Sequence, residues 1–190
     1  LDSYKNILPK MKITKSVEII HELEKHLKKN IKFCGLITKI FKRQSPRGWW
    51  ASIHINDLSG SVEISIYSDI LSKYEDYLKE KNLILIDTEV KNESNQSPRI
   101  VAKRITSLNE FIADNNYNIT LFTKSNEYLN QLIPLLGVLE PGYSNVLINC
   151  SNEVQEVEIK IKENVKLSSN FINSMSNVSG IDNISFSESL

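Results

Sequence analysis

The chain has 190 residues, of which 41% are hydrophobic and 24% charged, with 23 Lys and Arg against 23 Asp and Glu. This length suits two small domains with modest cores. Cys34 and Cys150 are too few for a disulfide framework and lack metal-ligand spacing. No apolar run reaches the ~18 residues of a membrane span, and no signal-peptide pattern opens the sequence. We therefore expect a soluble cytoplasmic protein with reduced thiols, no metal and no cofactor.

The balanced total hides an uneven distribution of charge along the chain. Residues 1–106 hold 19 Lys and Arg against 13 Asp and Glu, whereas residues 107–190 hold 4 against 10. A basic half joined to an acidic half predicts two different kinds of partner. The alternative is that both halves are ordinary solvated surfaces that differ in composition.

Residues 1–30 are predicted to form a helical connector. Val17, Ile20, Leu23 and Leu27 recur at helical spacing, with Ser16 placed to cap the helix N-terminus. A segment with one apolar stripe is too small to be a domain. It is expected to pack on the following domain or on a region outside this chain.

Residues 31–107 show the pattern of a five-stranded barrel. Apolar and polar residues alternate with period two through several runs, which predicts half-buried strands. The predicted strands are 31–43, 49–57, 62–67, 83–90 and 100–105, and an amphipathic helix is predicted at 68–80 between the third and fourth strands. This order of elements is that of an oligonucleotide/oligosaccharide-binding (OB) fold.

Beyond this region, a polar stretch at 108–117 is predicted to be a linker with a short helical turn. Residues 118–190 then read as strand, helix, two strands, helix and strand. The predicted fold class is thus a β barrel plus an α+β unit: a five-stranded OB fold followed by a small βαββαβ docking domain.

The strongest functional signal is the first hairpin of the barrel. Basic side chains crowd its tip, two tryptophans follow directly, and further basic residues come from the last hairpin and strand; the candidate nucleic-acid-binding residues are Lys39, Lys42, Arg43, Arg47, Trp49, Trp50, Lys91, Arg99 and Lys103. Single-stranded nucleic acids are bound by cations that follow the phosphates and by aromatic faces on which bases stack. Alternation puts the tryptophans on opposite faces, so at most one is expected to be exposed. The alternative is that the cations solvate strand ends and one tryptophan is core, since this fold also hosts protein-binding modules.

Catalytic motifs are missing from the sequence. It has no phosphate-cradling glycine loop, no paired carboxylates to hold two metals and no nucleophile elbow, so we expect no catalytic residues and no metal. Residues 131–136 (QLIPLL) loosely resemble the peptides that bind sliding clamps, but their apolar residues fit a helix that covers a sheet. His54 is expected at the surface, and Asp57 is explained by the turn that contains it.

Three stretches resemble one protein family. Residues 34–38 (CGLIT), 47–48 (RG) and 55–63 (INDLSGSVE), continued by 83–86 (LILI), are similar to the C-terminal barrel of the bacterial replicative DNA polymerase III alpha subunit. The resemblance implies a C-terminal fragment of a DNA-directed DNA polymerase, itself without the catalytic carboxylates.

By this resemblance, the barrel binds single-stranded template DNA, the last domain binds the tau subunit of the clamp loader, and the rest of the polymerase chain is a further partner. Lys42, Arg43 and Arg47 match the basic loop tip of the family. Ser45-Pro46 and the paired tryptophans depart from its pattern. The rival interpretations are a protein-interaction module without direct nucleic-acid binding and, disfavoured by missing synthetase motifs, a tRNA-binding barrel.

Overall fold

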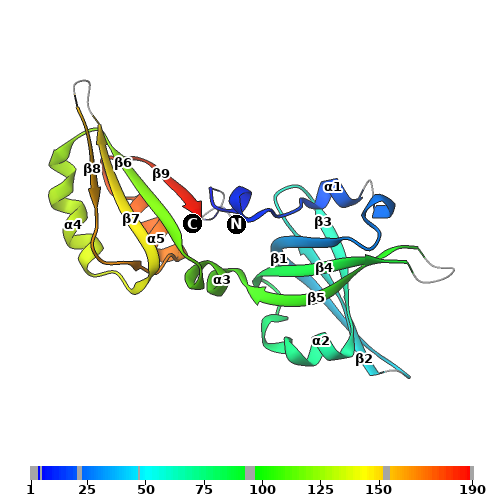
Figure 1. Cartoon of the computed structure of the whole chain (residues 1–190). Helices are drawn as coiled ribbons and strands as arrows, with labels where there is room; N and C mark the ends of the chain where they lie inside the picture. Colours follow the sequence, from blue (N-terminus) through cyan, green and yellow to red (C-terminus); the bar gives the residue numbers. More distant parts are fainter. Residues whose placement is uncertain are drawn as a thin grey trace. The chain divides into compact units, whose positions relative to one another are not determined.

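The computed structural model describes Tyr4 and residues 6–20, 23–46, 48–92, 97–151 and 155–188. The chain divides into two compact units. The first, called the barrel unit here, comprises Met11–Leu108, and the second comprises Asn109–Leu190 with the N-terminal segment that ends at Lys10. Both units are built mostly of β strands (Figure 1), which confirms the expected mostly-β architecture.

Five strands close the barrel in the order β1-β2-β3-β5-β4. They are β1 (Asn30–Ser45), β2 (Gly48–Asn56), β3 (Ser61–Ile66), β4 (Leu83–Lys91) and β5 (Arg99–Ser107). Neighbouring strands run antiparallel except β3 and β5, which pair in parallel through Ser65 and Val101. Helix α2 (Ser68–Lys73) and the 3-10 turn η4 (Glu75–Tyr77) lie between β3 and β4, where the sequence predicts one longer helix.

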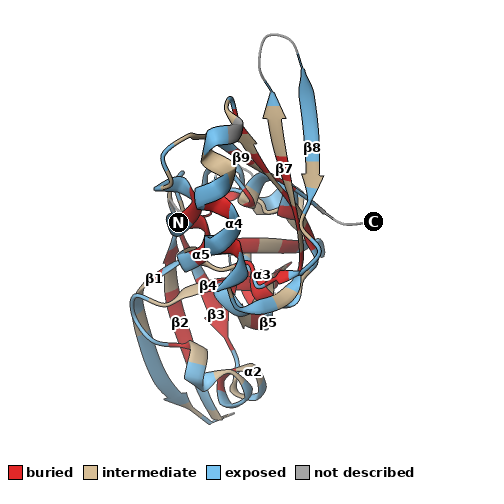
Figure 2. Ribbon diagram, turned by 90° about the vertical axis from the view of Figure 1, so that its left-hand side faces the viewer, coloured by how far each residue is buried: buried red, intermediate tan, exposed pale blue. Residues whose placement is uncertain are grey.

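The inward side chains of these strands form one apolar core. Figure 2 colours the buried residues red along the ribbon. Isoleucine dominates it because a β-branched side chain packs well on a pleated surface. The fully buried members include Phe33, Ile37, Ile53, Ile64, Ile66, Ile84, Ile86 and Ile105. Each such side chain contributes about 1.5–3 kcal/mol of transfer free energy, so burial of this core favours closure of the barrel.

Strand β1 pairs with β4 in its first half and with β2 in its second half. At Gly35 a Cβ would lie 2.5 Å from the backbone oxygen of Asn56, so this close approach requires glycine. The register with β2 then shifts between Ile37 and Lys39. A bulge of this kind inserts one residue and changes which side chains face outward beyond it.

The N-terminal segment differs from the predicted single helix. It holds the 3-10 turn η2 (Leu8–Met11), the short helix α1 (Ser16–Ile20) and the 3-10 turn η3 (Leu23–His26). The predicted apolar stripe is wrong at its start: Val17 and Ile20 are exposed, and Ile19 is the residue buried in the barrel core. Helix α1 ends at Ile20, and Leu23 packs against the barrel core from the separate turn η3.

The second unit begins with α3 (Leu108–Asp114), where the sequence predicts a linker with a helical turn. The elements that follow are β6 (Tyr117–Thr123), η5 (Asn126–Tyr128), α4 (Leu129–Gly137), β7 (Pro141–Ser151), β8 (Glu156–Lys160), α5 (Ser169–Ser176) and β9 (Ile181–Glu188). The sheet has the order β8-β7-β6-β9, with β6 and β7 parallel. Its core side carries alternate residues of β6, β7 and β9, such as Ile119, Val146 and Phe186.

Two prolines lie inside regular elements of this unit. Pro134 lies inside α4, and the helix continues past it to Gly137. Pro141 and Gly142 belong to strand β7, and Pro141 bridges Val165.

In the part of the chain that the structure describes, no helix is long and apolar enough to cross a membrane. The same residues contain no group of three or more His, Cys, Asp or Glu side chains that could hold a metal ion.

Candidate nucleic-acid interface

The outward side chains of β1, β2 and β3 lie in rows across the three strands. We call the surface that they form the outer barrel face. Ala51, Ile53 and Ile55 point into the core, so the residues between them on β2 point outward. The strand register then sets the rows across the three strands, which are Lys39–His54–Glu63, Phe41–Ser52–Ser65 and Arg43–Trp50.

Aromatic side chains mark this face. Phe41 is 48% exposed and meets the edge of His54, with ring centroids 5.9 Å apart. Trp50 is half-buried, and Tyr67, in extended backbone directly after β3, is exposed. Sequence reasoning missed Phe41 and Tyr67, although alternation from Arg43 and from Ser65 places each of them on the face.

Three cations lie on or beside the outer barrel face. Lys39, Arg43 and Arg99 are exposed, and no ion pair joins any of them to another described residue. An acidic side chain, Glu63, also lies on this face, and its carboxylate accepts a hydrogen bond from the Ser52 hydroxyl. The face therefore keeps a net positive charge available to an anionic ligand.

A groove of about 460 Å³ lies between this face and the elements α1 and η3. We call it the first groove; it is lined by Ile19, Ile20, Leu23, Trp50, Ser61, Val62, Glu63, Ser65, Pro98, Arg99 and Ile100. One wall is apolar and comes from α1 and η3, while the other carries the indole of Trp50 and the guanidinium of Arg99. The groove thus combines flat apolar surface with a cation.

Asp57 holds α1 beside the first groove through a hydrogen bond to its N-terminus. Its Oδ2 accepts the backbone N–H of Ser16 at 2.7 Å, and its Oδ1 accepts those of Ser59 at 2.6 Å and Gly60 at 2.8 Å. Partial burial raises the pKa of Asp57, but these hydrogen bonds outweigh it and leave the pKa below its ordinary value. The predicted turn role of Asp57 is confirmed, and this carboxylate replaces Ser16 as the cap of α1.

Lys91 and Lys103 do not line this groove, and they share a carboxylate. The Lys103 ammonium is 3.1 Å from Glu89 and donates to Asn30 at 2.9 Å, while the Lys91 ammonium lies 4.0 Å from Glu89. Glu89 therefore offsets one of their two positive charges. Lys91 lies opposite Arg99 in the register of β4 and β5, so of these two predicted residues it is the one next to the groove.

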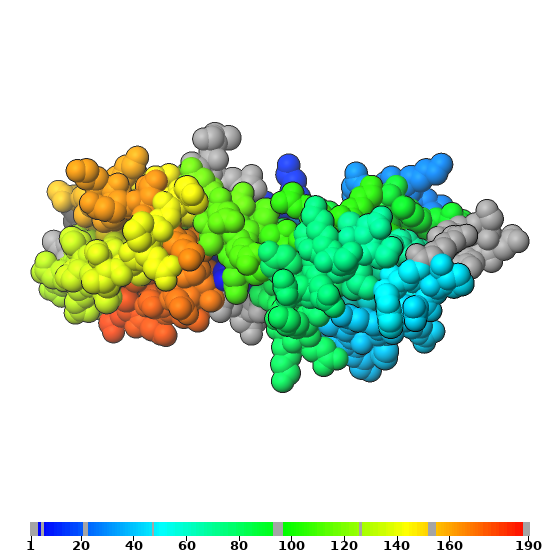
Figure 3. Space-filling view, turned by 90° about the horizontal axis from the view of Figure 1, so that it is seen from below, coloured from blue at the N-terminus to red at the C-terminus, as the bar shows by residue number. Residues whose placement is uncertain are grey.

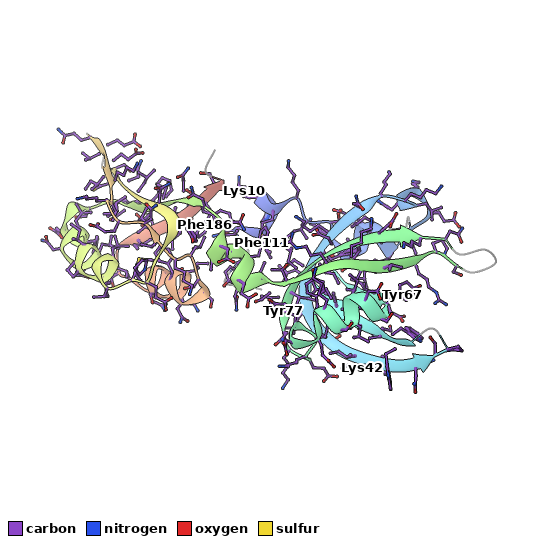
Figure 4. All side chains as sticks on the ribbon, turned by 60° about the horizontal axis from the view of Figure 1, so that its bottom comes forward. Lys10, Lys42, Tyr67, Tyr77, Phe111 and Phe186 are labelled. Carbon is purple, nitrogen blue, oxygen red and sulfur yellow. The ribbon has the colours of Figure 1, made fainter. Side chains whose placement is uncertain are left out.

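Lys42 and Trp49 face the opposite side of the β1–β2 hairpin. Lys42 lies opposite Ala51 in the register, and its ammonium forms an ion pair with Glu75 at 2.6 Å. Figure 4 shows Lys42 on the hairpin, with Tyr67 and Tyr77 at the two ends of the helical segment beside it. The tryptophans therefore occupy opposite faces as predicted, although both are partly accessible. Arg47 lies outside the described residues.

Comparison with known proteins finds sequence similarity over most of the chain. The chain is 26% identical over 138 residues to the DNA polymerase III subunit alpha of Rickettsia bellii, and 23% identical over the same length to those of Rickettsia felis and Rickettsia prowazekii. Over most of its length, this chain is similar to a DNA polymerase III alpha subunit. The alignments cover 72% of this chain but 11–12% of those relatives, so the chain spans a small part of them. No family model matches.

Solved structures give remoter likenesses. A mitochondrial single-stranded DNA binding protein from S. cerevisiae matches with a TM-score of 0.36 at 13% identity, over 43% of this chain and 96% of that chain. An asparaginyl-tRNA synthetase from Pyrococcus horikoshii matches with a TM-score of 0.34 at 12% identity, over 44% of this chain and 20% of that chain.

Proposed function

We propose that the barrel unit binds single-stranded DNA along the outer barrel face and the first groove. The observation that carries the proposal is the gathering, on one face, of accessible aromatic rings and of three cations that form no ion pair with the residues the structure describes. Lys39, Arg43 and Arg99 would contact phosphates, while Phe41 and Trp50 would stack bases.

This arrangement favours a ligand that is anionic and has unpaired bases. Stacking on an aromatic ring contributes roughly 1–3 kcal/mol per base and tolerates any sequence, because every base has a π face. A duplex hides these faces, so it could satisfy the cations but not the rings. The preference for single strands follows from the rings more than from the charge.

We further propose that the chain is the non-catalytic C-terminal region of a replicative DNA polymerase. The similarity to DNA polymerase III alpha subunits supports this role, and the parent chain would supply the DNA-directed DNA polymerase activity. In this proposal residues 31–107 bind template and residues 118–190 dock a replisome protein, the tau subunit of the clamp loader by resemblance. The acidic composition of residues 107–190, with 10 Asp and Glu against 4 Lys and Arg, suits a basic partner surface.

A second function, protein interaction without DNA, has one observation in its favour. Apolar side chains near the first groove are accessible, with Ile20 54% and Leu58 69% exposed, and Glu63 places a negative charge on the outer barrel face. An apolar protein partner would tolerate this acid better than a phosphate backbone would. Binding to DNA separates the two functions.

The test is fluorescence anisotropy of a labelled oligothymidine at several salt concentrations. With three phosphates neutralised, the slope of log K against log salt is expected near −2, from about −0.7 per contact for single strands. Arg43→Ala/Arg99→Ala removes two contacts and is expected to bring the slope to about −0.7. Lys160→Ala/Lys162→Ala, in the second unit, is the charge-matched control and should leave the slope unchanged. Absence of binding by the unmodified chain at low salt, or equal effects of the two double variants, would contradict the proposal.

A further inference from the structure

A second groove lies on the other face of the β1–β2 hairpin and is not used by the proposed interface. It has a volume of about 440 Å³ and is lined by Lys42, Trp49, Ser68, Leu71, Ser72 and Glu75. Figure 3 shows the two elements that form it, α2 in teal and the hairpin in cyan, side by side on one face of the barrel unit. Its size is within the range of about 300–1,000 Å³ typical of small-ligand sites.

The apolar part of the second groove is an exposed indole above a buried floor. Trp49 is 52% exposed, whereas Leu71, on the lining from α2, belongs to the barrel core. Large aromatic side chains contribute most when their faces are covered. A planar, partly apolar group that inserts here would cover the face of Trp49 against the wall of α2.

The polar part of the groove selects the chemistry of that group. Glu75 is an exposed carboxylate held by the Lys42 ammonium at 2.6 Å, and this hydrogen bond and charge lower the pKa of Glu75. Glu75 is therefore ionised at neutral pH and can only accept hydrogen bonds. The Lys42–Glu75 pair has no net charge to attract a phosphate, while an amino group on a planar ring would find an acceptor in Glu75.

Nucleobases combine these properties, and they differ in the amino group. Cytosine presents an N4 amino donor to which carboxylates bind, whereas thymine presents an acceptor and a methyl group. The second groove lies close to the proposed interface, on the other side of the same β strand, since the consecutive residues Trp49 and Trp50 point to opposite faces of β2. A nucleic-acid strand that contacts Arg43 and Trp50 on the outer barrel face would reach Trp49 by passing around the hairpin.

We propose that the second groove binds an unstacked nucleobase with an exocyclic amino group, cytosine above thymine, from a single strand that passes around the hairpin. Trp49 stacks the base and Glu75 accepts its amino hydrogen. This inference rests on the proposed function, because the strand arrives by way of the outer barrel face. It adds a base preference that stacking on the first groove alone does not give.

The test compares oligocytidine with oligothymidine of equal length by anisotropy at one salt concentration. The unmodified chain is expected to bind oligocytidine about three- to tenfold more tightly, from one carboxylate–amino contact. Trp49→Ala should weaken both strands roughly tenfold, as the loss of one stacked base would, and Trp49→Phe should restore most of this. Glu75→Leu, which has no hydrogen-bond acceptor in its side chain, should abolish the difference between the two strands.

The possible outcomes separate the inference from the function on which it rests. If Arg43→Ala/Arg99→Ala weakens binding while Trp49→Ala and Glu75→Leu change nothing, the proposed function stands and the second groove is not a base site. If Trp49→Ala weakens both strands while the unmodified chain binds them equally, recognition of an amino group is overturned. If the unmodified chain binds neither strand, the proposed function itself fails. Circular dichroism of each variant checks its fold.

Discussion

Asp57 holds the N-terminal wall of the first groove, and its removal should destabilise the barrel unit. The Asp57→Ala variant leaves three backbone N–H groups without the carboxylate that accepts them at 2.6–2.8 Å, those of Ser16, Ser59 and Gly60. Loss of one helix cap costs about 0.5–2 kcal/mol. Water reaches some of the freed donors, because Asp57 is itself half-exposed, so we expect about 2 kcal/mol for the three together.

Urea unfolding followed by tryptophan fluorescence measures this loss, since both tryptophans, Trp49 and Trp50, belong to the barrel unit. The folded pKa of Asp57 is lowered, so its contribution is complete above the unfolded value of about 3.9 and disappears as the pH falls through the folded value. The stability gap between the two proteins should therefore close in acid. The matched control Asp69→Asn, whose carboxylate accepts from Ser68 Oγ at 3.3 Å, should change little. A gap that stays constant from neutral pH to about pH 2 would refute the reasoning.

Three further predictions concern the barrel and the thiols. Gly35→Ala should destabilise the barrel unit by about 1–3 kcal/mol in the same urea assay, because its Cβ would overlap the backbone of Asn56; a neutral effect would mean that the strands can separate there. Burial raises the pKa of Cys34 to about 12, so a thiol reagent at neutral pH should label the half-buried Cys150 first, and equal rates in the native protein would contradict this. Lys103→Ala should change single-strand affinity by less than about twofold in the anisotropy assay, because Glu89 holds this ammonium; a larger loss would place it in the interface.

The strands of the barrel could be predicted because inward residues alternate with outward ones over long runs. The same rule placed Trp49 and Trp50 on opposite faces and His54 near the surface. Applied to β1, the rule also puts the consecutive residues Lys42 and Arg43 on opposite faces, although the sequence groups them at one tip. Which set faces outward could not be predicted, because the register shift between Ile37 and Lys39 reverses the phase of β1 and a bulge leaves no mark in a single sequence.

The N-terminal helix and the pairing of cations could not be predicted for a different reason. Val17 and Ile20 fit a helical stripe, but α1 has five residues, and its N-terminus is held by Asp57, which lies 41 residues from Ser16 in sequence. Likewise, Glu89 pairs with lysines that come from two strands. Contacts of this range depend on how the strands register, and local patterns do not record them.

Intrinsic fluorescence tests directly whether single-stranded DNA binds at Trp50. The Trp49→Phe variant, in which Trp50 is the remaining tryptophan, is titrated with unlabelled single-stranded DNA. We expect the fluorescence of Trp50 to be quenched to saturation as bases stack on its ring, and to be quenched less at higher salt. A matched duplex at equal phosphate concentration should quench much less. Fluorescence that stays unchanged at low salt, or that responds equally to the duplex, would contradict the claim that the outer barrel face binds single-stranded DNA.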